Sequence, residues 1–219
     1  MDDASLAKED LGPTLVIIAW TFAAIATIVV FVRYYVRLRI VRKTTFDDLL
    51  ILLTLCLAIG DSVFCTLSVH WGLGRHIQFL SPDEITNSIK WIYLCEFFSI
   101  MSPGFGRISF AFLLLGLIPP TKWRQRYLWS IITCQFIVDV VTVIISFSQC
   151  RPMRGFWDSN VHAHCWLPSV QQRTGYFQGS VCSLVDMLLA LFPASLFWSL
   201  QMKLRMKISL SILMGLGLL

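Results

Sequence analysis

Four ionisable residues lie inside long apolar stretches of this sequence, where charged side chains are rare. They are Asp61, Arg107, Asp139 and Asp186, and each belongs to a different stretch. A charge in hydrocarbon is costly, so such residues usually face a protein interior and mark a ligand site, an ion pathway or a structural pair. Three acids and one base could together bind a cation or a cationic ligand, or form a proton-linked switch.

A structural role explains the same four residues equally simply. Arg107 could pair with one aspartate to hold helices together, while the other acids are protonated or face trapped water. Counted at about 1.5 Å per helical residue, all four lie about 17 to 21 Å from the same end of their helices. We therefore expect one polar layer near mid-membrane. Glu96 is eleven residues before Arg107, shares its helical face, and is expected near the outer mouth of the bundle.

The stretches that position these residues are long enough to cross a bilayer. Of the 219 residues, 56% are hydrophobic and 14% are charged, which is outside the range of a soluble domain. A spanning helix needs about 20 apolar residues. We predict spans at roughly 13–35, 46–68, 91–118, 127–148 and 176–200.

A sixth apolar stretch begins near Ile208 and reaches Leu219 at the end of the sequence. It is about 18 Å long as a helix, short of the roughly 30 Å hydrocarbon core. The expected fold class is all-α, a polytopic transmembrane helix bundle with five full spans plus a partial sixth. Residues 1–12 are expected to form an extracellular leader, and residues 13–219 a bundle that is incomplete at its C-terminal end.

The basic residues between the spans predict an orientation. Most of the 18 lysines and arginines follow spans one, three and five, which the positive-inside rule places in the cytoplasm. The N-terminus is then extracellular, and the leader has no basic segment of a cleavable signal. The net charge of +5 thus reflects membrane topology and does not indicate nucleic-acid binding. We expect the protein to lie in the plasma membrane, with the lipid bilayer as its partner. The basic residues after these spans are Arg33, Arg37, Arg39, Arg42, Lys43, Lys122, Arg124, Arg126, Lys203, Arg205 and Lys207.

Two segments bear on the helix geometry. Pro103, followed by Gly104 and Gly106, predicts a kink in span three, because proline has no N–H for the carbonyl of Ser99. A broken helix there would open a cavity beside Arg107, although simple kinks are commoner. In span five, a stripe of small or polar residues suits close packing against a neighbouring helix; its members are Gly175, Gly179, Ser183 and Asp186.

Two of the seven cysteines, Cys150 and Cys165, lie in the longest outer loop. A disulfide between them would close about 15 residues and contribute roughly 3 kcal/mol in the chain-entropy model. Cys95 or the more distant Cys65 could replace either partner, and no bridge at all is a third alternative.

Other site chemistry is weakly indicated. His162 and His164 beside Cys165 could bind zinc or copper, but a histidine cluster without metal is commoner, so we expect no metal and no cofactor. The sequence has no zinc-protease motif, no phosphate-binding loop and no nucleophile elbow. We therefore do not expect an enzyme.

Several motifs resemble the fungal rhodopsin-domain family in the order that the family shows. They are Asp47-Asp48, Gly72-Leu73-Gly74-Arg75-His76, Cys150-Arg151-Pro152, Phe156-Trp157-Asp158, Cys165, Asp186, Leu191-Phe192-Pro193 and the segment 198–207. The resemblance covers about residues 33–219 and implies a seven-span, receptor-like membrane protein. The segment 102–107 departs from the uninterrupted, lysine-bearing helix that the family usually has there.

The leading functional expectation is a receptor-like surface protein. An unknown small-molecule or surface ligand would engage the disulfide loop or the region near Glu96, and the basic inner loops would report to an intracellular signalling partner. A transporter or ion-coupled carrier would instead use Asp61, Arg107, Asp139 and Asp186 as a midplane site. A structural or accessory membrane protein is the third alternative.

Overall fold

The computed structural model describes residues 10–41, 46–117, 121–158 and 161–199. The partial sixth span from Ile208, most of the acidic leader, and the basic residues Arg42, Lys43, Lys203, Arg205 and Lys207 lie outside the described residues.

Five long helices make up most of the described chain. They are α2 (Gly12–Val36), α3 (Phe46–His70), α4 (Pro82–Leu117), α5 (Lys122–Phe147) and α6 (Pro168–Ser199), and a short π-helix, η1 (Arg37–Val41), continues α2. Each contains a segment long and apolar enough to span a membrane, which confirms the five predicted spans.

The helices α4 and α6 begin earlier than their predicted spans, at Pro82 and Pro168. The start of α4 is a capping box, in which Glu84 accepts from the backbone N–H of Ser81 at 2.8 Å and the Ser81 hydroxyl faces the N–H of Glu84. Hydropathy finds only the apolar part of a helix, so these polar first turns were missed.

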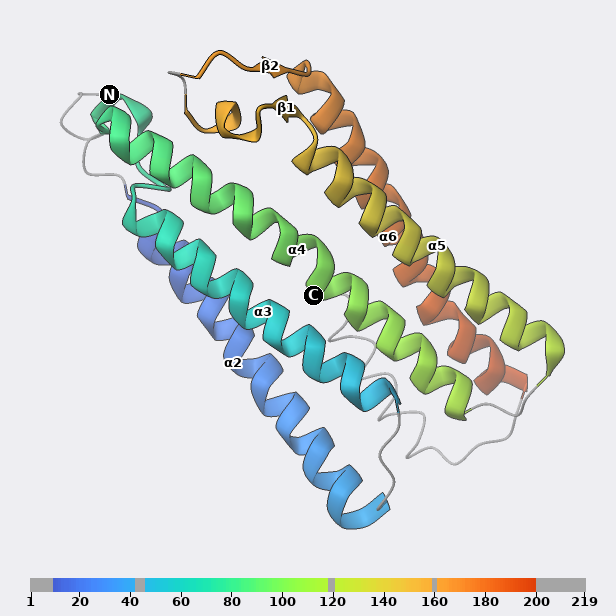
Figure 1. The fold of residues 1–219 in the computed structure, drawn as a ribbon. Coiled ribbons are helices and arrows are strands. Elements are labelled where there is room, and N and C mark those ends of the chain that lie inside the picture. Colours follow the sequence, from blue (N-terminus) through green and yellow to red (C-terminus); the bar gives the residue numbers. More distant parts are fainter. Residues whose placement is uncertain (1–9, 42–45, 118–120, 159–160, 200–219) are drawn as a thin grey trace.

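Consecutive helices pack side by side, with α4 in the middle of the bundle (Figure 1). On one side, α4 packs along α3, and α3 also packs against α2. On the other side, α4 packs against α5, and α5 also packs against α6. Helix α4 contacts α6 directly as well. Because α4 reaches three neighbouring helices, its side chains determine how the two halves of the bundle are held together.

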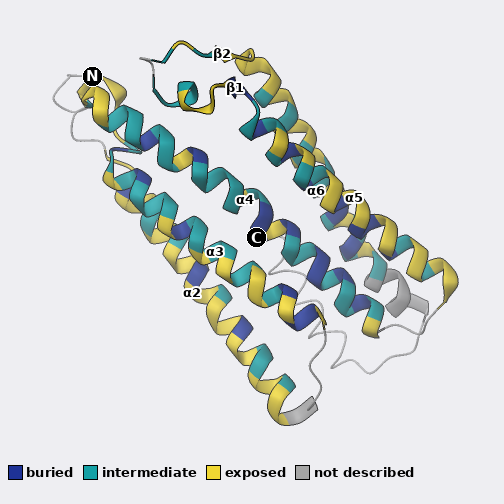
Figure 2. Cartoon of the chain, in the orientation of Figure 1, coloured by how far each residue is buried: buried dark blue, intermediate teal, exposed yellow. Residues whose placement is uncertain are grey.

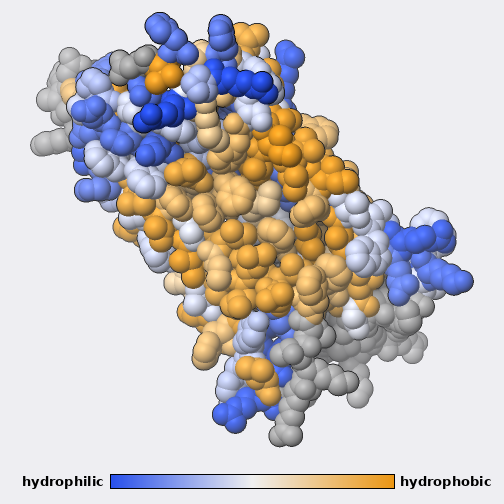
Figure 3. Space-filling view, viewed as in Figure 1, coloured by the Kyte–Doolittle hydropathy of each residue, from blue (hydrophilic) through white to orange (hydrophobic). Residues whose placement is uncertain are grey.

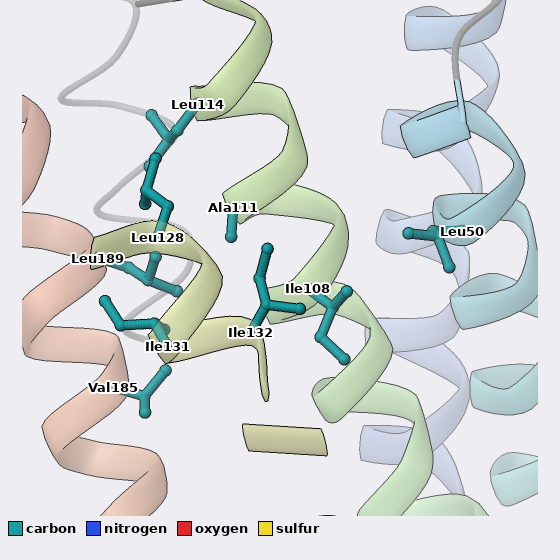
Figure 4. Packing of buried hydrophobic residues seen from close by; sticks show 9 residues of the cluster. All are labelled: Leu50, Ile108, Ala111, Leu114, Leu128, Ile131, Ile132, Val185 and Leu189. Atoms are coloured by element: carbon teal, nitrogen blue, oxygen red, sulfur yellow. The ribbon is translucent and has the colours of Figure 1, made fainter. Parts of the chain in front are cut away.

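The hydrophobic core lies mainly between α4, α5 and α6 (Figure 4). Leu128, Ile131 and Ile132 of α5 fill the space between α4 and α6, and Leu50 points from α3 toward α4. The outward helix faces are exposed and apolar, and they form a hydrophobic belt between two hydrophilic ends (Figures 2 and 3). Such faces are satisfied by lipid, so a small interior core is sufficient.

We call the two ends of the bundle by their contents. The disulfide end carries the loop between α5 and α6, where β1 (Cys150–Arg151) pairs antiparallel with β2 (His164–Cys165). Cys150 and Cys165 are directly opposite in this ladder and form a disulfide, which confirms the predicted bridge, while Cys65 and Cys95 are free. Two 3-10 turns also lie at this end, η2 (Ile77–Phe79) and η3 (Met153–Phe156), and the Arg151–Pro152 peptide is cis.

The basic end carries the last turn of α2 with η1 and the first turns of α5, including Arg33, Arg37, Lys122 and Arg126. These are basic residues of the loops that the sequence predicts to lie on one side of the membrane.

Candidate functional site

Arg107 of α4 and Asp186 of α6 form a two-pronged ion pair. The guanidinium Nε donates to Oδ1 at 2.6 Å and Nη2 donates to Oδ2 at 2.9 Å. Parallel bonds of this kind fix orientation as well as charge. The side chains are 20% and 29% exposed, so the pair lies partly inside the bundle. It is the main polar connection between α4 and α6 in the described part of the chain.

Asp139 of α5 lies beside this pair and is only 3% exposed. The Gln135 amide donates to both of its carboxylate oxygens, at 2.8 and 2.9 Å, and to the Cys182 sulfur of α6 at 3.6 Å. Arg107 also attracts Asp139 electrostatically, without a direct bond. We call Arg107, Gln135, Asp139 and Asp186 the central polar site.

Gly104 makes the central polar site possible. A Cβ atom at this position would collide with Oδ2 of Asp139, so only glycine lets α5 bring a carboxylate this close to α4. Gly106, two residues further on, has only an ordinary contact with the Thr54 methyl group at 3.5 Å. The two glycines therefore have different roles, although the sequence presents them as one helix-weakening pair.

The broken helix considered as an alternative to a kink in span three is absent: α4 is helical without interruption through Pro103. Proline removes one backbone hydrogen bond, and the helix is held there by its neighbour, since the Ser102 hydroxyl donates to the Thr54 carbonyl at 3.1 Å. The space beside Arg107, lined also by Ala111, Ile131 and Val185, is too narrow for a water molecule. The arrangement is thus a packed polar contact and not an open channel.

The prediction of a single layer is wrong for Asp61. Its Oδ1 accepts from the Cys95 thiol at 3.0 Å, and Cys95 is twelve residues, about 18 Å, before Arg107 along α4. The antiparallel register of α3 and α4 decides this, because Ser109 donates to the Asp47 carbonyl at 2.9 Å and thereby fixes which turns face each other. Counting from each helix end ignores such offsets.

Glu96 lies at the level of Asp61, toward the disulfide end. It accepts from the Ser146 hydroxyl of α5 at 2.8 Å, and the Ser146 carbonyl accepts from the Tyr93 hydroxyl at 3.0 Å. The five predicted site residues therefore divide into two groups. Arg107, Asp139 and Asp186 meet in the central polar site, whereas Asp61 and Glu96 lie nearer the disulfide end, at Cys95 and Ser146.

Tyr93 also joins α4 to the disulfide loop. Its ring, 2% exposed, lies 4.8 Å from the ring of Phe147, 4.5 Å from that of Phe156 and 5.8 Å from that of Trp157. Phe156 and Trp157 belong to the segment that the disulfide closes. The loop therefore rests directly on the central helix through an aromatic cluster.

The ionic network at the basic end was missed as a site. Arg33 and Arg37 both donate to Oδ2 of Asp47, at 2.5 and 2.7 Å, and both face the Asp48 carboxylate, at 3.5 and 3.2 Å. The two acids are buried, and the Tyr34 hydroxyl donates to the Asp48 carbonyl at 3.0 Å. Two arginines one helical turn apart, followed by an acidic pair, are a sequence pattern that could have predicted this ionic network. From the sequence, we used the arginines only to predict topology.

Two other expectations concern α6 and metal binding. Within the described residues, nothing lies within 4 Å of a Cβ atom built on Gly175 or Gly179, so the glycines of the stripe have no described packing partner, whereas its member Asp186 meets Arg107 of α4. In the same ranges, no three His, Cys, Asp or Glu side chains are arranged to hold a metal ion.

Five spanning helices around a polar centre define a multi-pass α-helical membrane protein. The family model of the fungal rhodopsin domain matches residues 32–219, so the chain belongs to the fungal rhodopsin-domain family. The match includes the central polar site, the disulfide loop and both partners of the ionic network. Comparison with curated proteins and with solved structures gives no match.

Proposed function

We propose that this chain is a receptor-like protein of the plasma membrane, with the disulfide end outside the cell and the basic end in the cytoplasm. An unknown small-molecule or surface ligand acts at the disulfide end, and an intracellular signalling partner responds at the basic end. The concentration of Lys and Arg at the basic end supports this orientation. The proposal includes no enzymatic activity.

The observation that carries the proposal is the contact between the disulfide loop and α4. Tyr93 is buried against Phe156 and Trp157, so a ligand that displaces the loop must either move α4 or break these ring contacts. Packed interiors do not deform continuously, and small shifts are converted into discrete rearrangements.

The same helix reaches the other end of the bundle. Arg107 of α4 holds Asp186 of α6, and two residues later Ser109 donates to the backbone carbonyl of Asp47, within the ionic network. A shift of α4 would therefore disturb both of these contacts at once. A receptor needs an element with two arrangements that both sites influence. Exchange of the Arg107–Asp186 pair for another partner, such as Asp139, would supply it.

An ion-coupled carrier is the second candidate, because one observation favours it. The buried Asp139 carboxylate is bonded by a neutral amide, and a carboxyl in such a place can take up or release a proton. The narrow space beside Arg107 argues against a passage through this part of the bundle.

Hydrogen–deuterium exchange of the full chain in lipid nanodiscs tests the coupling. The Cys150→Ser/Cys165→Ser variant opens the loop, and the matched control is Cys56→Ser/Cys134→Ser, which replaces two exposed free cysteines. We expect faster exchange in residues 46–50 and 105–110 for the first variant but not for the control. Changes confined to residues 148–170 would contradict transmission through α4.

Flux measurements in liposomes separate the two candidates. A carrier predicts proton or cation flux in the wild-type protein that Asp186→Asn abolishes. Reproducible flux of this kind would overturn the receptor proposal. Vesicles that show no such flux, together with faster hydrogen exchange in residues 46–50 and 105–110 of the disulfide variant, would support it.

A further inference from the structure

The start of α5 carries a positive charge that the described protein does not neutralise. Lys122, Arg124 and Arg126 lie within its first two turns and form no ion pair with any described residue. The acids at this end, Asp47 and Asp48, already face Arg33 and Arg37. Figure 3 shows the hydrophilic side chains projecting at the right edge, where α5 begins in Figure 1.

This arrangement is unfavourable in the isolated chain. Cations at a helix N-terminus oppose the helix dipole, and like charges four residues apart repel each other. Lys122 and Arg126 have this spacing, and Arg126 Nε lies 3.4 Å from the Lys122 carbonyl oxygen. An anion bound between the two side chains would relieve both effects.

The charged residues continue into an indole and then into an apolar surface. Lys122, Arg126 and Trp129 follow one another at spacings of four and three residues, so they lie on one face of α5. Trp129 is 52% exposed, and its ring meets Phe112 of α4 edge-on at 5.6 Å, which holds it at the rim of the bundle. Tryptophan in this position is typical of the membrane interface.

Beyond Trp129, the same face is exposed and largely apolar. Its members are Thr133, Phe136, Ile137 and Ile144. The distance from Trp129 to Ile144 is about 22 Å, more than the roughly 15 Å of hydrocarbon in one leaflet. The face lies opposite Leu128, Gln135 and Asp139, which are buried in the bundle. We call this stripe, from Lys122 to Ile144, the lipid stripe.

We propose that the lipid stripe binds an anionic phospholipid, with its headgroup phosphate between Lys122 and Arg126 and an acyl chain along Phe136 and Ile137. The order of charge, indole and apolar surface matches the headgroup, interface and acyl region of a single lipid molecule. A soluble acidic protein would match only the first of these three parts. This proposal is independent of the receptor or carrier function.

Native mass spectrometry of the full chain in uncharged detergent tests the site. The protein is titrated with dioleoylphosphatidylserine and, as reference, with dioleoylphosphatidylcholine. The test variant is Lys122→Gln/Arg126→Gln. The matched control is Arg154→Gln/Arg173→Gln, which removes two exposed arginines at the disulfide end and the same net charge. Thermal unfolding midpoints in the same detergent show whether both variants are folded.

We expect the wild type to retain phosphatidylserine in preference to phosphatidylcholine. Each cation near the headgroup contributes about fivefold in affinity, so the double variant should bind phosphatidylserine roughly 30-fold more weakly and the control unchanged. The single variants Lys122→Gln and Arg126→Gln should each lose about fivefold, and they serve if the double variant is unstable.

Three outcomes would overturn the proposal. Equal losses in the double variant and the control would mean that only net charge matters, and no loss in either would mean that the stripe is not the site. Inorganic phosphate or polyglutamate that binds as tightly as phosphatidylserine, and loses binding in the same variant, would make the surface a site for a soluble anion or an acidic protein.

Discussion

Replacing Gly104 by alanine should destabilise the protein, because the added methyl group would occupy the position of the Asp139 carboxylate. A Cβ atom at this position collides with Oδ2 of Asp139, which is held by two hydrogen bonds from Gln135. The carboxylate can move only by giving up those bonds or by pushing α5 away from α4. Overpacking of this kind typically costs about 1–3 kcal/mol.

The helical preference for alanine works in the opposite direction. Gly-to-Ala in a helix interior stabilises by roughly 0.5–1 kcal/mol, so the net change expected for Gly104→Ala is a loss of up to about 2.5 kcal/mol. Gly106→Ala is the matched control on the same helix, since its Cβ atom meets only the Thr54 methyl group at 3.5 Å. We expect Gly106→Ala to be neutral or slightly stabilising.

Thermal or denaturant unfolding of the purified full chain in one detergent measures both variants. The Asp139→Ala background supplies a second check, because removing the carboxylate makes room for the methyl group. Gly104→Ala should then cost little, which gives a coupling energy of about 1 kcal/mol or more between the two positions. A Gly104→Ala protein as stable as Gly106→Ala would refute the close approach of α5 to α4.

Three further predictions concern charge and covalent structure. Arg107→Leu should lower the free energy of unfolding by about 1–3 kcal/mol, because Asp186 loses a two-pronged partner, and Arg107→Leu/Asp186→Leu should cost less than the two single changes together; unfolding curves of the three variants test this. At the disulfide end, the N–H of Gly12 and then Arg75 lower the pKa of Asp10, so the contact is intact above the ordinary pKa near 3.8 and is lost as the pH falls through the lowered value. Amide exchange at the start of α2 should therefore increase only in strong acid, and Asp10→Asn should remove this pH dependence. Cys150→Ser should lower stability by roughly 3 kcal/mol under oxidising conditions and by nothing under reducing conditions, as measured by unfolding with and without reductant.

Hydropathy alone was sufficient to place the five spans, because a chain in lipid must bury its backbone polar groups in helices of bilayer length. The same constraint made charges inside the apolar stretches conspicuous, and three of the four, Arg107, Asp139 and Asp186, do meet. The location of Cys150 and Cys165 in one loop favoured their disulfide over a bridge to Cys95 or Cys65 and over no bridge, and the structure confirms it. These features depend on the type of each residue and on its position along the chain, and the sequence contains both.

Contacts between helices depended on register, tilt and the shape of small residues, which no single stretch of sequence contains. Asp61 lies at the level of Cys95 because α3 and α4 are offset, and not because of its own distance from a helix end. Gly104 and Gly106 read alike in the sequence, yet only one of them faces a carboxylate. The pairing of Arg33 and Arg37 with Asp47 and Asp48 likewise required the turn between α2 and α3 to bring both pairs together. The sequence by itself determined which segments lie in the membrane, and the tertiary structure decided which of their polar groups meet, because pairing energies depend on distances between helices.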